Sequence, residues 1–416
     1  MTASYVHLIQ RYPPALGGAE SYFARLSEYL VGQHLPIEVH TTNAIALESF
    51  WRNGAATAPA NVSSIRGVTV HRHAVRRFPG RRYILKAVSC LPHPWVQGFS
   101  LPASPQLPSL LALARTSRKP IRLIHASAFP YTFPLFCGLL WARRLNLPFL
   151  LTPFLHLGDI AKAQDRTRDA YLSPPLRYLL QQADRIFVQT ELERNAVCAL
   201  AIPQHRVVLQ GLGVEPKECT AGNRVRGNHN WNLPEDNAVR IGHLANLSYE
   251  KGTVDLLHAA CELHKLQINF RMVLAGPSMP NFLDAWRKLP SAVAARVHRL
   301  GILAEHEKPD FFAITDIFAL PSRSDSYGLV LLEAWANGIP CIGYRAGGIA
   351  EVIQHERDGL LVDCGNIRDL ACAILQLIQD ERGRRNLGES GLRKVLEHHR
   401  WKDKLEIVHQ VYRALT

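Results

Sequence analysis

Short apolar runs separated by amphipathic stretches recur along most of the chain. In the first half, runs typical of buried strands occur at residues 5–10, 37–41, 68–73, 121–125, 149–152, 185–189 and 206–209. Helical patterns lie between most of them, for example at residues 135–145 and 176–183. Strands that alternate with helices in this way predict a mainly parallel sheet with helices on both faces. Ligands of such sheets bind beyond the carboxyl ends of the strands.

The alternation is interrupted by a polar stretch at residues 217–237, which is rich in Gly, Asn and Pro. This composition, without a hydrophobic period, predicts a linker. A chain of 416 residues also favours two domains over a single core. Strand patterns return at residues 239–244, 270–275, 297–303, 316–320, 340–344 and 360–363. We therefore predict an α/β protein with a first doubly wound domain at 1–216, the linker, a second domain at 238–400, and a final helix at 401–416.

The stretch at residues 321–340 holds the most informative chemistry. The buried strand pattern before it ends at Pro321, a polar loop follows, and a helical pattern runs from Leu329 to a stop at Gly338. This helix is apolar on nearly every face, so we expect it to be buried, yet Glu333 lies in its middle. A buried carboxylate is unfavourable unless another group pairs with it.

Two carboxylates can meet at the start of this helix. Side chains lean toward the N-terminus of a helix, so Glu333 is expected to point back toward Asp325 and Tyr327. The unpaired N–H groups of the first turn and the positive end of the helix dipole make this end an anion site. The carboxylates can then accept hydroxyl hydrogen bonds on either side of a bound phosphate. The alternative from these residues alone is a buried helix in which Glu333 caps a neighbouring loop.

The run DSYGLVLLE at residues 325–333 resembles the E-x7-E signature of retaining glycosyltransferases of family 4, which have the GT-B fold. Asp325 stands where the family usually has its first glutamate, and Glu333 matches the second. The continuation through Pro340 and the Gly347-Gly348 pair also matches. The resemblance implies two Rossmann-like doubly wound domains that face each other across a cleft. It also implies that the final helix at 401–416 crosses back to the first domain.

Further elements resemble the same family. Gly17 and Gly18 lie between a strand pattern and a helical pattern, where glycine lets the backbone approach a phosphate or sugar closely. Gly-Gly pairs are also common in plain turns. Lys251, beside a glycine, matches the lysine that holds the donor diphosphate, and a lysine at a strand-to-helix turn suits that role. His156 follows a strand, where the family carries a histidine that faces the donor sugar; an isolated histidine is more often structural.

Three positions depart from the family pattern. Asp325 replaces the usual glutamate, and Asn246 stands where the family has an arginine that binds the diphosphate. Arg323, in the other loop, is a candidate substitute for that charge. Leu212 stands in place of the asparagine of an Asn-Gly-Val element. These departures do not change the assignment to the glycosyltransferase class, but they leave the identity of the nucleotide-sugar donor undetermined.

The resemblance implies an enzyme that transfers a sugar from a nucleotide sugar, with retention, to a glycan or lipid-linked glycan in envelope polysaccharide synthesis. Glu333 would hold the ribose and Asp325 the sugar hydroxyls, and no cofactor or metal is expected. Lys251 and the helix start would compensate the charge of the leaving diphosphate. The predicted catalytic residues are His156, Asp325 and Glu333; the predicted donor-binding residues are Gly17, Gly18, Asn246, Lys251, Arg323, Tyr327, Gly328, Leu329 and Val330.

Two other functional classes are open. A nucleotide-sugar epimerase or a sugar-phosphate synthase can use the same fold, and the epimerase would release nucleoside diphosphate without a glycosylated product. The net charge of +13 indicates an anionic partner. Nucleic-acid binding would show a steep salt dependence, but basic and aromatic residues interleave only near residues 76–95, so we expect no nucleic acid.

Residues 76–95 also match an amphipathic helix at a membrane surface. The same pattern describes a helix packed on the domain with a solvated basic side. If the segment docks on an anionic membrane, the lipid-linked acceptor would be presented there. The basic residues concerned are Arg76, Arg77, Arg81, Arg82 and Lys86.

The remaining composition bears on compartment and metals. No run of about 18 apolar residues and no signal-peptide pattern is visible, so we expect a cytoplasmic protein, peripheral on the inner face of the membrane. The eight cysteines are scattered, which favours reduced thiols over disulfides or a zinc site. His71 and His73 alternate on an expected strand, and we interpret them as structural and not as metal ligands.

Overall fold

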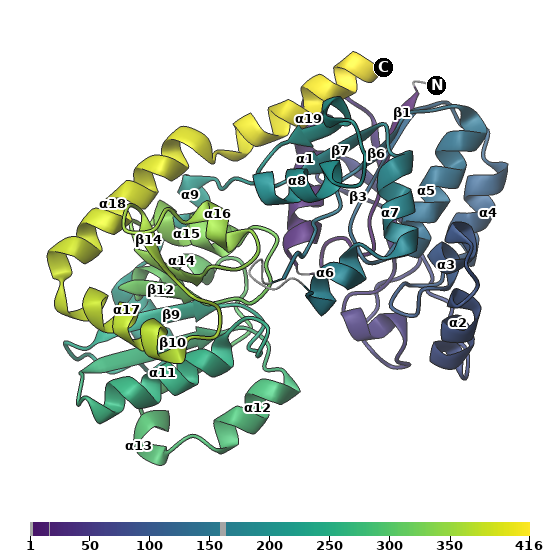
Figure 1. The fold of residues 1–416 in the computed structure, drawn as a ribbon. Coiled ribbons are helices and arrows are strands. Elements are labelled where there is room, and N and C mark those ends of the chain that lie inside the picture. Colours follow the sequence, from purple (N-terminus) through teal and green to yellow (C-terminus); the bar gives the residue numbers. More distant parts are fainter. Residues whose placement is uncertain (1–2, 16, 159–163) are drawn as a thin grey trace. The chain divides into compact units, whose positions relative to one another are not determined.

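The structure, a computed structural model, describes residues 3–15, 17–158 and 164–416 (Figure 1). The chain divides into two compact units. The first comprises Met1–Leu155, Arg168–Gln210 and Leu405–Thr416, and the second comprises His156–Thr167 and Gly211–Lys404. Each unit contains its own sheet.

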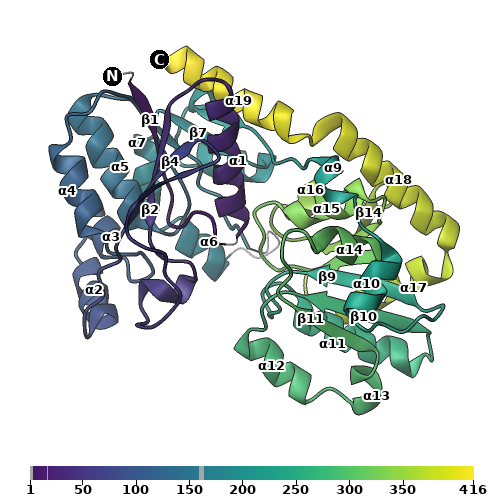
Figure 2. The same cartoon turned by 180° about the vertical axis from the view of Figure 1, so that it is seen from behind.

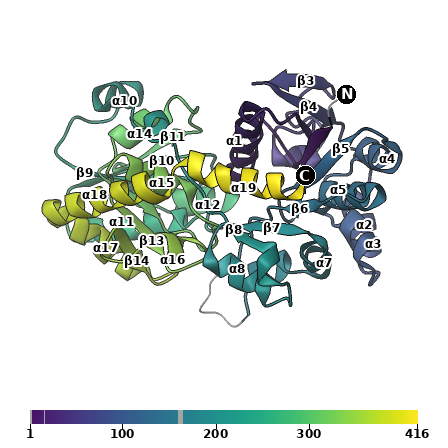
Figure 3. The same cartoon turned by 90° about the horizontal axis from the view of Figure 1, so that it is seen from above.

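In the described part of the first unit, eight strands form one sheet in the order β3-β4-β2-β1-β5-β6-β7-β8. β3 lies at one edge and is antiparallel to β4; the other neighbours are parallel (Figure 3). The order reverses between β1 and β5, and Gly17 and Gly18 follow β1. The strands are β1 (Ser4–Leu8), β2 (Ile37–Thr42), β3 (Val62–Ile65), β4 (Val68–His73), β5 (Ile121–Ala126), β6 (Phe149–Leu151), β7 (Arg185–Val188) and β8 (Val207–Leu209).

Several helices of this unit pack on the sheet through buried apolar side chains. In α5, for example, Leu135, Phe136 and Leu139 are completely buried. The helices are α1 (Gly18–Gly32), α2 (Arg81–Ser89), α3 (Pro94–Ser100), α4 (Pro108–Thr116), α5 (Thr132–Leu145), α6 (Arg166–Tyr171), which begins in the second unit, α7 (Pro174–Gln182) and α8 (Glu191–Cys198), with 3-10 turns at Leu47–Phe50 and Gln204–Arg206.

The C-terminal helix α19 (Trp401–Leu415) ends on the first unit, where its buried Tyr412 joins two buried histidines. The Tyr412 hydroxyl lies 2.9 Å from Nε2 of His7 and 2.7 Å from Nδ1 of His125. The remaining ring nitrogens are also paired, with Ser27 for His7 and Thr152 for His125. Burial lowers the pKa of His7 to about 3 and holds that of His125 well below its usual value.

These buried histidines predict that the protein loses stability in mild acid. The unfolded chain binds protons near pH 6.5, whereas the folded chain leaves His7 neutral until about pH 3. The unfolded state therefore binds more protons below pH 6.5, and stability falls by up to about 1.4 kcal/mol per pH unit for each such histidine. We expect the unfolding temperature measured by calorimetry to drop between pH 7 and pH 5, and to drop less in His7→Gln. Equal values at the two pH values would contradict this.

In the described part of the second unit, six parallel strands have the order β11-β10-β9-β12-β13-β14, which is the Rossmann order 3-2-1-4-5-6. The order reverses between β9 and β12, so the loops that follow these two strands meet there. The strands are β9 (Val239–Leu244), β10 (Phe270–Ala275), β11 (Val297–Gly301), β12 (Ile317–Leu320), β13 (Cys341–Tyr344) and β14 (Gly359–Val362).

Helices pack on this sheet through a continuous apolar core. Strand residues such as Ile241 and Leu274 and helix residues such as Leu256 and Leu370 belong to this one core, and all four are completely buried. The helices are α9 (Pro216–Cys219), α10 (Arg224–Asn230), α11 (Thr253–Lys265), α12 (Pro280–Arg287), α13 (Ser291–Ala294), α14 (Lys308–Ala313), α15 (Leu329–Ala336), α16 (Ile349–Val352), α17 (Ile367–Gln379) and α18 (Glu381–His398).

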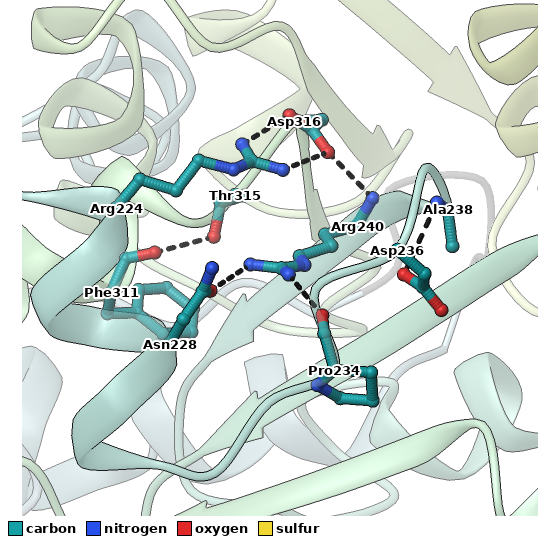
Figure 4. Close-up of polar contacts among 9 residues, drawn as sticks. All are labelled: Arg224, Asn228, Pro234, Asp236, Ala238, Arg240, Phe311, Thr315 and Asp316. Atoms are coloured by element: carbon teal, nitrogen blue, oxygen red, sulfur yellow. Dashed lines mark hydrogen bonds and ion pairs between the residues drawn. The ribbon is translucent and has the colours of Figure 1, made fainter.

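The expected linker at residues 217–237 differs from the structure, because it contains α10 and most of α9 and belongs to the second unit. Polar contacts hold it in place (Figure 4). Arg224 forms an ion pair with Asp316 at 2.8 Å, and the buried Arg240 of β9 donates to the carbonyl of Pro234 at 2.8 Å and to the side chain of Asn228. A segment held by ion pairs and hydrogen bonds shows no periodic pattern of apolar residues, so its sequence resembles that of a linker.

Candidate active site

The loops after β9 and β12 pack tightly against each other where the strand order reverses. Gly252, the N-cap of α11, has φ 72°, and an added Cβ there would lie 1.9 Å from the carbonyl oxygen of Pro321. Only glycine fits this position. The Arg323 amide also donates to the carbonyl of Glu250 at 2.9 Å. Lys251 is thereby held beside the loop that leads into α15.

The loop after β13 packs against the loop that contains Asp325 and Ser326. An added Cβ on Gly347 would lie 2.4 Å from the carbonyl oxygen of Asp325, and one on Gly348 would lie 2.1 Å from that of Ser326. The Gly348 amide donates to the Asp325 carbonyl at 2.8 Å. The glycine pair is therefore required by close backbone packing around Asp325.

Lys251 and Asp325 form the central ion pair of the site. Nζ of Lys251 lies 2.6 Å from Oδ2 of Asp325, and both side chains are mostly buried. The other carboxylate oxygen of Asp325 accepts the amides of Tyr327 at 3.3 Å and Gly328 at 3.0 Å. Burial alone would raise the pKa of Asp325, but Lys251, with His156 and these contacts, brings the pKa below its usual value. Asp325 is therefore ionised at neutral pH.

The start of α15 retains further donors. Gly328 is its N-cap in the left-handed region, with φ 82°, and its amide is already bound to Asp325. Within an α-helix the first amides have no partner, so those of Leu329 and Val330 are the donors left for an anion. The predicted anion site therefore offers the amides of Leu329 and Val330 but not that of Gly328.

Glu333 lies on α15 among buried apolar side chains, and its carboxylate is 3.9 Å from Nζ of Lys308. Lys308 also contacts Glu305 at 2.9 Å. Burial alone would lower the pKa of Lys308, but Glu333 and Glu305 together raise it above its usual value. This lysine, at the start of α14, was not predicted, and no motif in the sequence marks it.

His156 approaches the same loop. Its Nδ1 lies 3.5 Å from the Ser324 hydroxyl. Burial, with a smaller contribution from Lys251, lowers the pKa of His156 to about 4. The ring is therefore neutral near pH 7, which suits hydrogen bonding to a sugar hydroxyl better than proton donation.

Arg323 and Asn246 have different environments. Arg323 forms an ion pair with Asp255 of α11, and its guanidinium lies over the ring of Tyr249 at 3.9 Å. Asp255 also accepts the Tyr344 hydroxyl at 2.7 Å, so it fixes the direction of Arg323. Asn246 is exposed. Asp255 was missed by the sequence analysis, although an acidic residue in the first helical turn after Lys251-Gly252 is visible in the sequence.

The remaining predicted residues are Tyr327, Gly17 and Gly18. Tyr327 is buried and its hydroxyl lies 3.0 Å from Nδ1 of His399. Gly17 and Gly18, in the first unit, begin α1, where the buried Glu20 pairs with Arg11 at 2.7 Å. An added Cβ on Gly18 would meet no neighbouring atom within 4 Å.

Two family models match the chain. The model of glycosyl transferases group 1 matches residues 228–394, and that of a glycosyl transferase 4-like domain matches residues 17–213. Together they account for most of the sequence. The chain belongs to the group 1 glycosyltransferases. The resemblance stated from the 325–333 run is therefore confirmed.

Two curated relatives of this glycosyltransferase are similar to it over most of their length. An N-acetyl-alpha-D-glucosaminyl L-malate synthase from Bacillus anthracis is 27% identical over 68% of this chain and 72% of the relative. A D-inositol 3-phosphate glycosyltransferase from Kribbella flavida is 25% identical over 90% of this chain and 86% of the relative.

Solved structures show the same fold. Sucrose-phosphate synthase from Thermosynechococcus elongatus has a TM-score of 0.75 at 19% identity, covering 100% of this glycosyltransferase and 99% of that chain. HepE from Anabaena, in complex with UDP and glucose, has a TM-score of 0.71 at 18% identity over 100% and 99% of the two chains. The predicted GT-B fold class, with two Rossmann-like sheets, is confirmed.

Proposed function

We propose that this glycosyltransferase moves a sugar from a nucleoside-diphosphate sugar, with retention, to a glycan or lipid-linked acceptor of envelope polysaccharide synthesis. The observation that carries the proposal is the Lys251–Asp325 pair at the start of α15, where the strand order reverses. The complexes of HepE with UDP-glucose and with UDP and glucose support a nucleotide-sugar donor.

The two charges of the pair suit two different parts of such a donor. The diphosphate would bind Nζ of Lys251 and the amides of Leu329 and Val330, and a hydroxyl of the sugar would donate a hydrogen bond to the carboxylate of Asp325. We assign the ribose to Glu333 and a sugar hydroxyl to His156. In transfer, the bond from the anomeric carbon to the phosphate oxygen breaks, a bond to the acceptor oxygen forms, and the acceptor proton passes to the leaving phosphate.

Product analysis tests this proposal. The purified enzyme is incubated with a panel of nucleotide sugars and candidate acceptors, and the products are analysed by NMR. The proposal predicts a glycoside whose anomeric configuration matches that of the donor. Release of nucleoside diphosphate without any glycoside would favour an epimerase, and an inverted product would contradict retention.

We propose that transfer requires no metal ion, because Lys251 and the start of α15 can offset the charge of the leaving diphosphate. Turnover is therefore expected to continue unchanged in excess EDTA, as measured by nucleoside diphosphate release. Added magnesium should not raise the rate of the treated enzyme. A strict requirement for magnesium or manganese would contradict this part of the proposal.

We propose further that α2 docks the first unit on an anionic membrane surface. α2 lies at the outer edge of this unit (Figures 1 and 2). Within α2, Tyr83 is 80% exposed, Ile84 51% and Val88 39%, beside the exposed Arg82 and Lys86. Exposed apolar and basic side chains on one short helix are typical of a membrane-surface element. Within the described residues, none of the helices is apolar over a length that could span a bilayer.

The structure corrects the predicted set of basic contacts. Arg81 is buried and donates to the carbonyls of Pro102 and Ser104, so its charge is not available to a membrane. Arg77 is half-buried and donates twice to the carbonyl of Ser49. The basic residues that remain for docking are Arg76, Arg82 and Lys86.

Replacing Arg76, Arg82 and Lys86 by serine is expected to lower binding to anionic vesicles at least tenfold in sedimentation. Each basic residue near an acidic bilayer contributes about 1 kcal/mol, and added salt should weaken wild-type binding in the same direction. A second variant, Tyr83→Ser with Ile84→Ser, should also release the protein. The matched control is Lys265→Ser with Leu266→Ser, an exposed pair at the end of α11. Equal sedimentation of all variants would show that α2 is an ordinary surface helix.

A further inference from the structure

Three side chains that can bind a metal share one face of the first sheet. β2 and β4 are parallel neighbours (Figure 2), and His40 is the register partner of His71. Glu38 lies two residues before His40 and therefore on the same face. Oε2 of Glu38 is 3.3 Å from Nε2 of His71 and 3.9 Å from Nε2 of His40. The three atoms lie within 4.8 Å of one another.

The two imidazole nitrogens have no hydrogen-bond partner among the residues that the structure describes, although both atoms are buried. His40 itself is only 2% exposed. Nε2 of His71 is close to Glu38, but the geometry is not that of a hydrogen bond. Oε2 of Glu38 already accepts a hydrogen bond from the half-exposed Lys119 at 3.4 Å, whereas the two imidazole nitrogens stay without a partner in the described part of the chain. Buried polar atoms are nearly always satisfied, so two such nitrogens beside one carboxylate indicate a site for a further ligand.

A hydrogen-bonded chain orients His40 toward the carboxylate. Its Nδ1 lies 3.0 Å from Nε2 of His73, and Nδ1 of His73 lies 3.0 Å from the Ser109 hydroxyl. With protons on both Nδ1 atoms, Nε2 of His40 presents a lone pair to Glu38. The His40 ring also packs on the ring of Trp141 in α5, with an angle of 76° between the two ring planes. Metal-binding histidines typically have their second nitrogen held in this way.

We propose that Glu38, His40 and His71 bind one Zn²⁺ ion that stabilises the first unit. Two imidazoles and a carboxylate are a zinc ligand set, and imidazole favours zinc over magnesium or calcium. Ligand atoms of a tetrahedral zinc lie about 3.4 Å apart. The Glu38–His71 pair already has this spacing, and the Glu38–His40 distance of 3.9 Å exceeds it by about half an ångström. The two imidazole nitrogens lie within 4.8 Å of each other. The rings of His40 and His71 now lie nearly parallel, so binding would tilt them toward each other.

Zinc binding by the full chain tests the proposal. The protein, purified without a histidine tag and dialysed against a chelator, is titrated with ZnCl₂ in a calorimeter, and its unfolding temperature is measured with and without zinc. We expect one zinc per chain and a higher unfolding temperature. His71→Gln and Glu38→Gln should each weaken binding about 100-fold, whereas His205→Gln, an exposed histidine of the same unit, should bind as the parent does.

Treatment with EDTA distinguishes a structural zinc site from a metal that takes part in sugar transfer. EDTA should lower the unfolding temperature of the zinc-loaded protein while leaving its transfer rate unchanged at a temperature where it stays folded. Zinc uptake by wild type that is no tighter than that of His71→Gln and Glu38→Gln would overturn the proposal. If His71→Gln does not fold, Glu38→Gln decides the same question, because glutamine keeps the shape of that side chain.

Discussion

Lys251→Met is expected to lower kcat/KM for the donor by about 10- to 150-fold, because a charge-assisted contact to a bound ligand contributes about 1.5–3 kcal/mol. The lost contact is the one between Nζ and the diphosphate. Steady-state kinetics with a nucleotide sugar measures the effect. Lys251→Arg keeps the positive charge and should retain part of the activity.

The same variant should also be less stable, because Asp325 remains in a mostly buried place without its ion pair at 2.6 Å. The matched control is Arg226→Met, which removes another 2.6 Å ion pair of the second unit, with Asp310. This control should lose stability without losing transfer. Near-wild-type kinetics in Lys251→Met, at substrate concentrations below KM, would remove Lys251 from the donor site.

Glu333→Gln is expected to reduce transfer at least tenfold, mainly by raising KM for the donor. Glutamine has the same shape but lacks the charge that strengthens a hydrogen bond from a ribose hydroxyl. The fold should persist, because Lys308 keeps its contact with Glu305 at 2.9 Å. Donor saturation curves and an unfolding temperature measure the two effects.

Glu305→Gln is the control for this second experiment. Glu305 contacts the same lysine but is 67% exposed, so we expect its replacement to change neither KM nor kcat. If both variants lose activity equally, the role of Glu333 is to hold Lys308 and not to bind the nucleotide. If Glu333→Gln behaves like the parent, the helix is simply buried and its carboxylate caps a neighbour.

The sequence predicted the fold well because buried parallel strands are continuous apolar runs. The strand pattern at residues 316–320 corresponds to β12 (Ile317–Leu320), in which every side chain is buried. β3 was missed because it is a partly exposed edge strand with two serines in its centre, and it carries no such run. The short helices α9 and α10 were read as a linker because ion pairs anchor them, and ion pairs have no fixed period.

Individual residues of the site could be predicted from the sequence, but the contacts between them could not. Glu333 and Lys251 can be named from motifs, but 74 residues separate Lys251 from Asp325, and only the packing of Gly252 on Pro321 shows that they meet. The exposure of a side chain also cannot be predicted from the sequence. Arg81 resembles a surface residue in the sequence, but in the structure its guanidinium donates to backbone carbonyls.

The histidines of the first sheet illustrate the same limit. His71 and His73 on one strand gave no reason to expect a metal, and we interpreted them as structural. The register that places His40 opposite His71 is a property of the folded sheet. A Glu-x-His pattern on one strand and a His-x-His pattern on another can be recognised as one site only once the strands are known to be neighbours.

The most direct test of the account is saturation-transfer NMR of the enzyme with a panel of nucleotide sugars. We predict that one donor shows saturation of its ribose and sugar protons with wild type, and that the signal is lost in Lys251→Met and kept in Arg226→Met. Absence of signal for every nucleotide sugar, or an equal signal in Lys251→Met, would contradict a donor site at the start of α15.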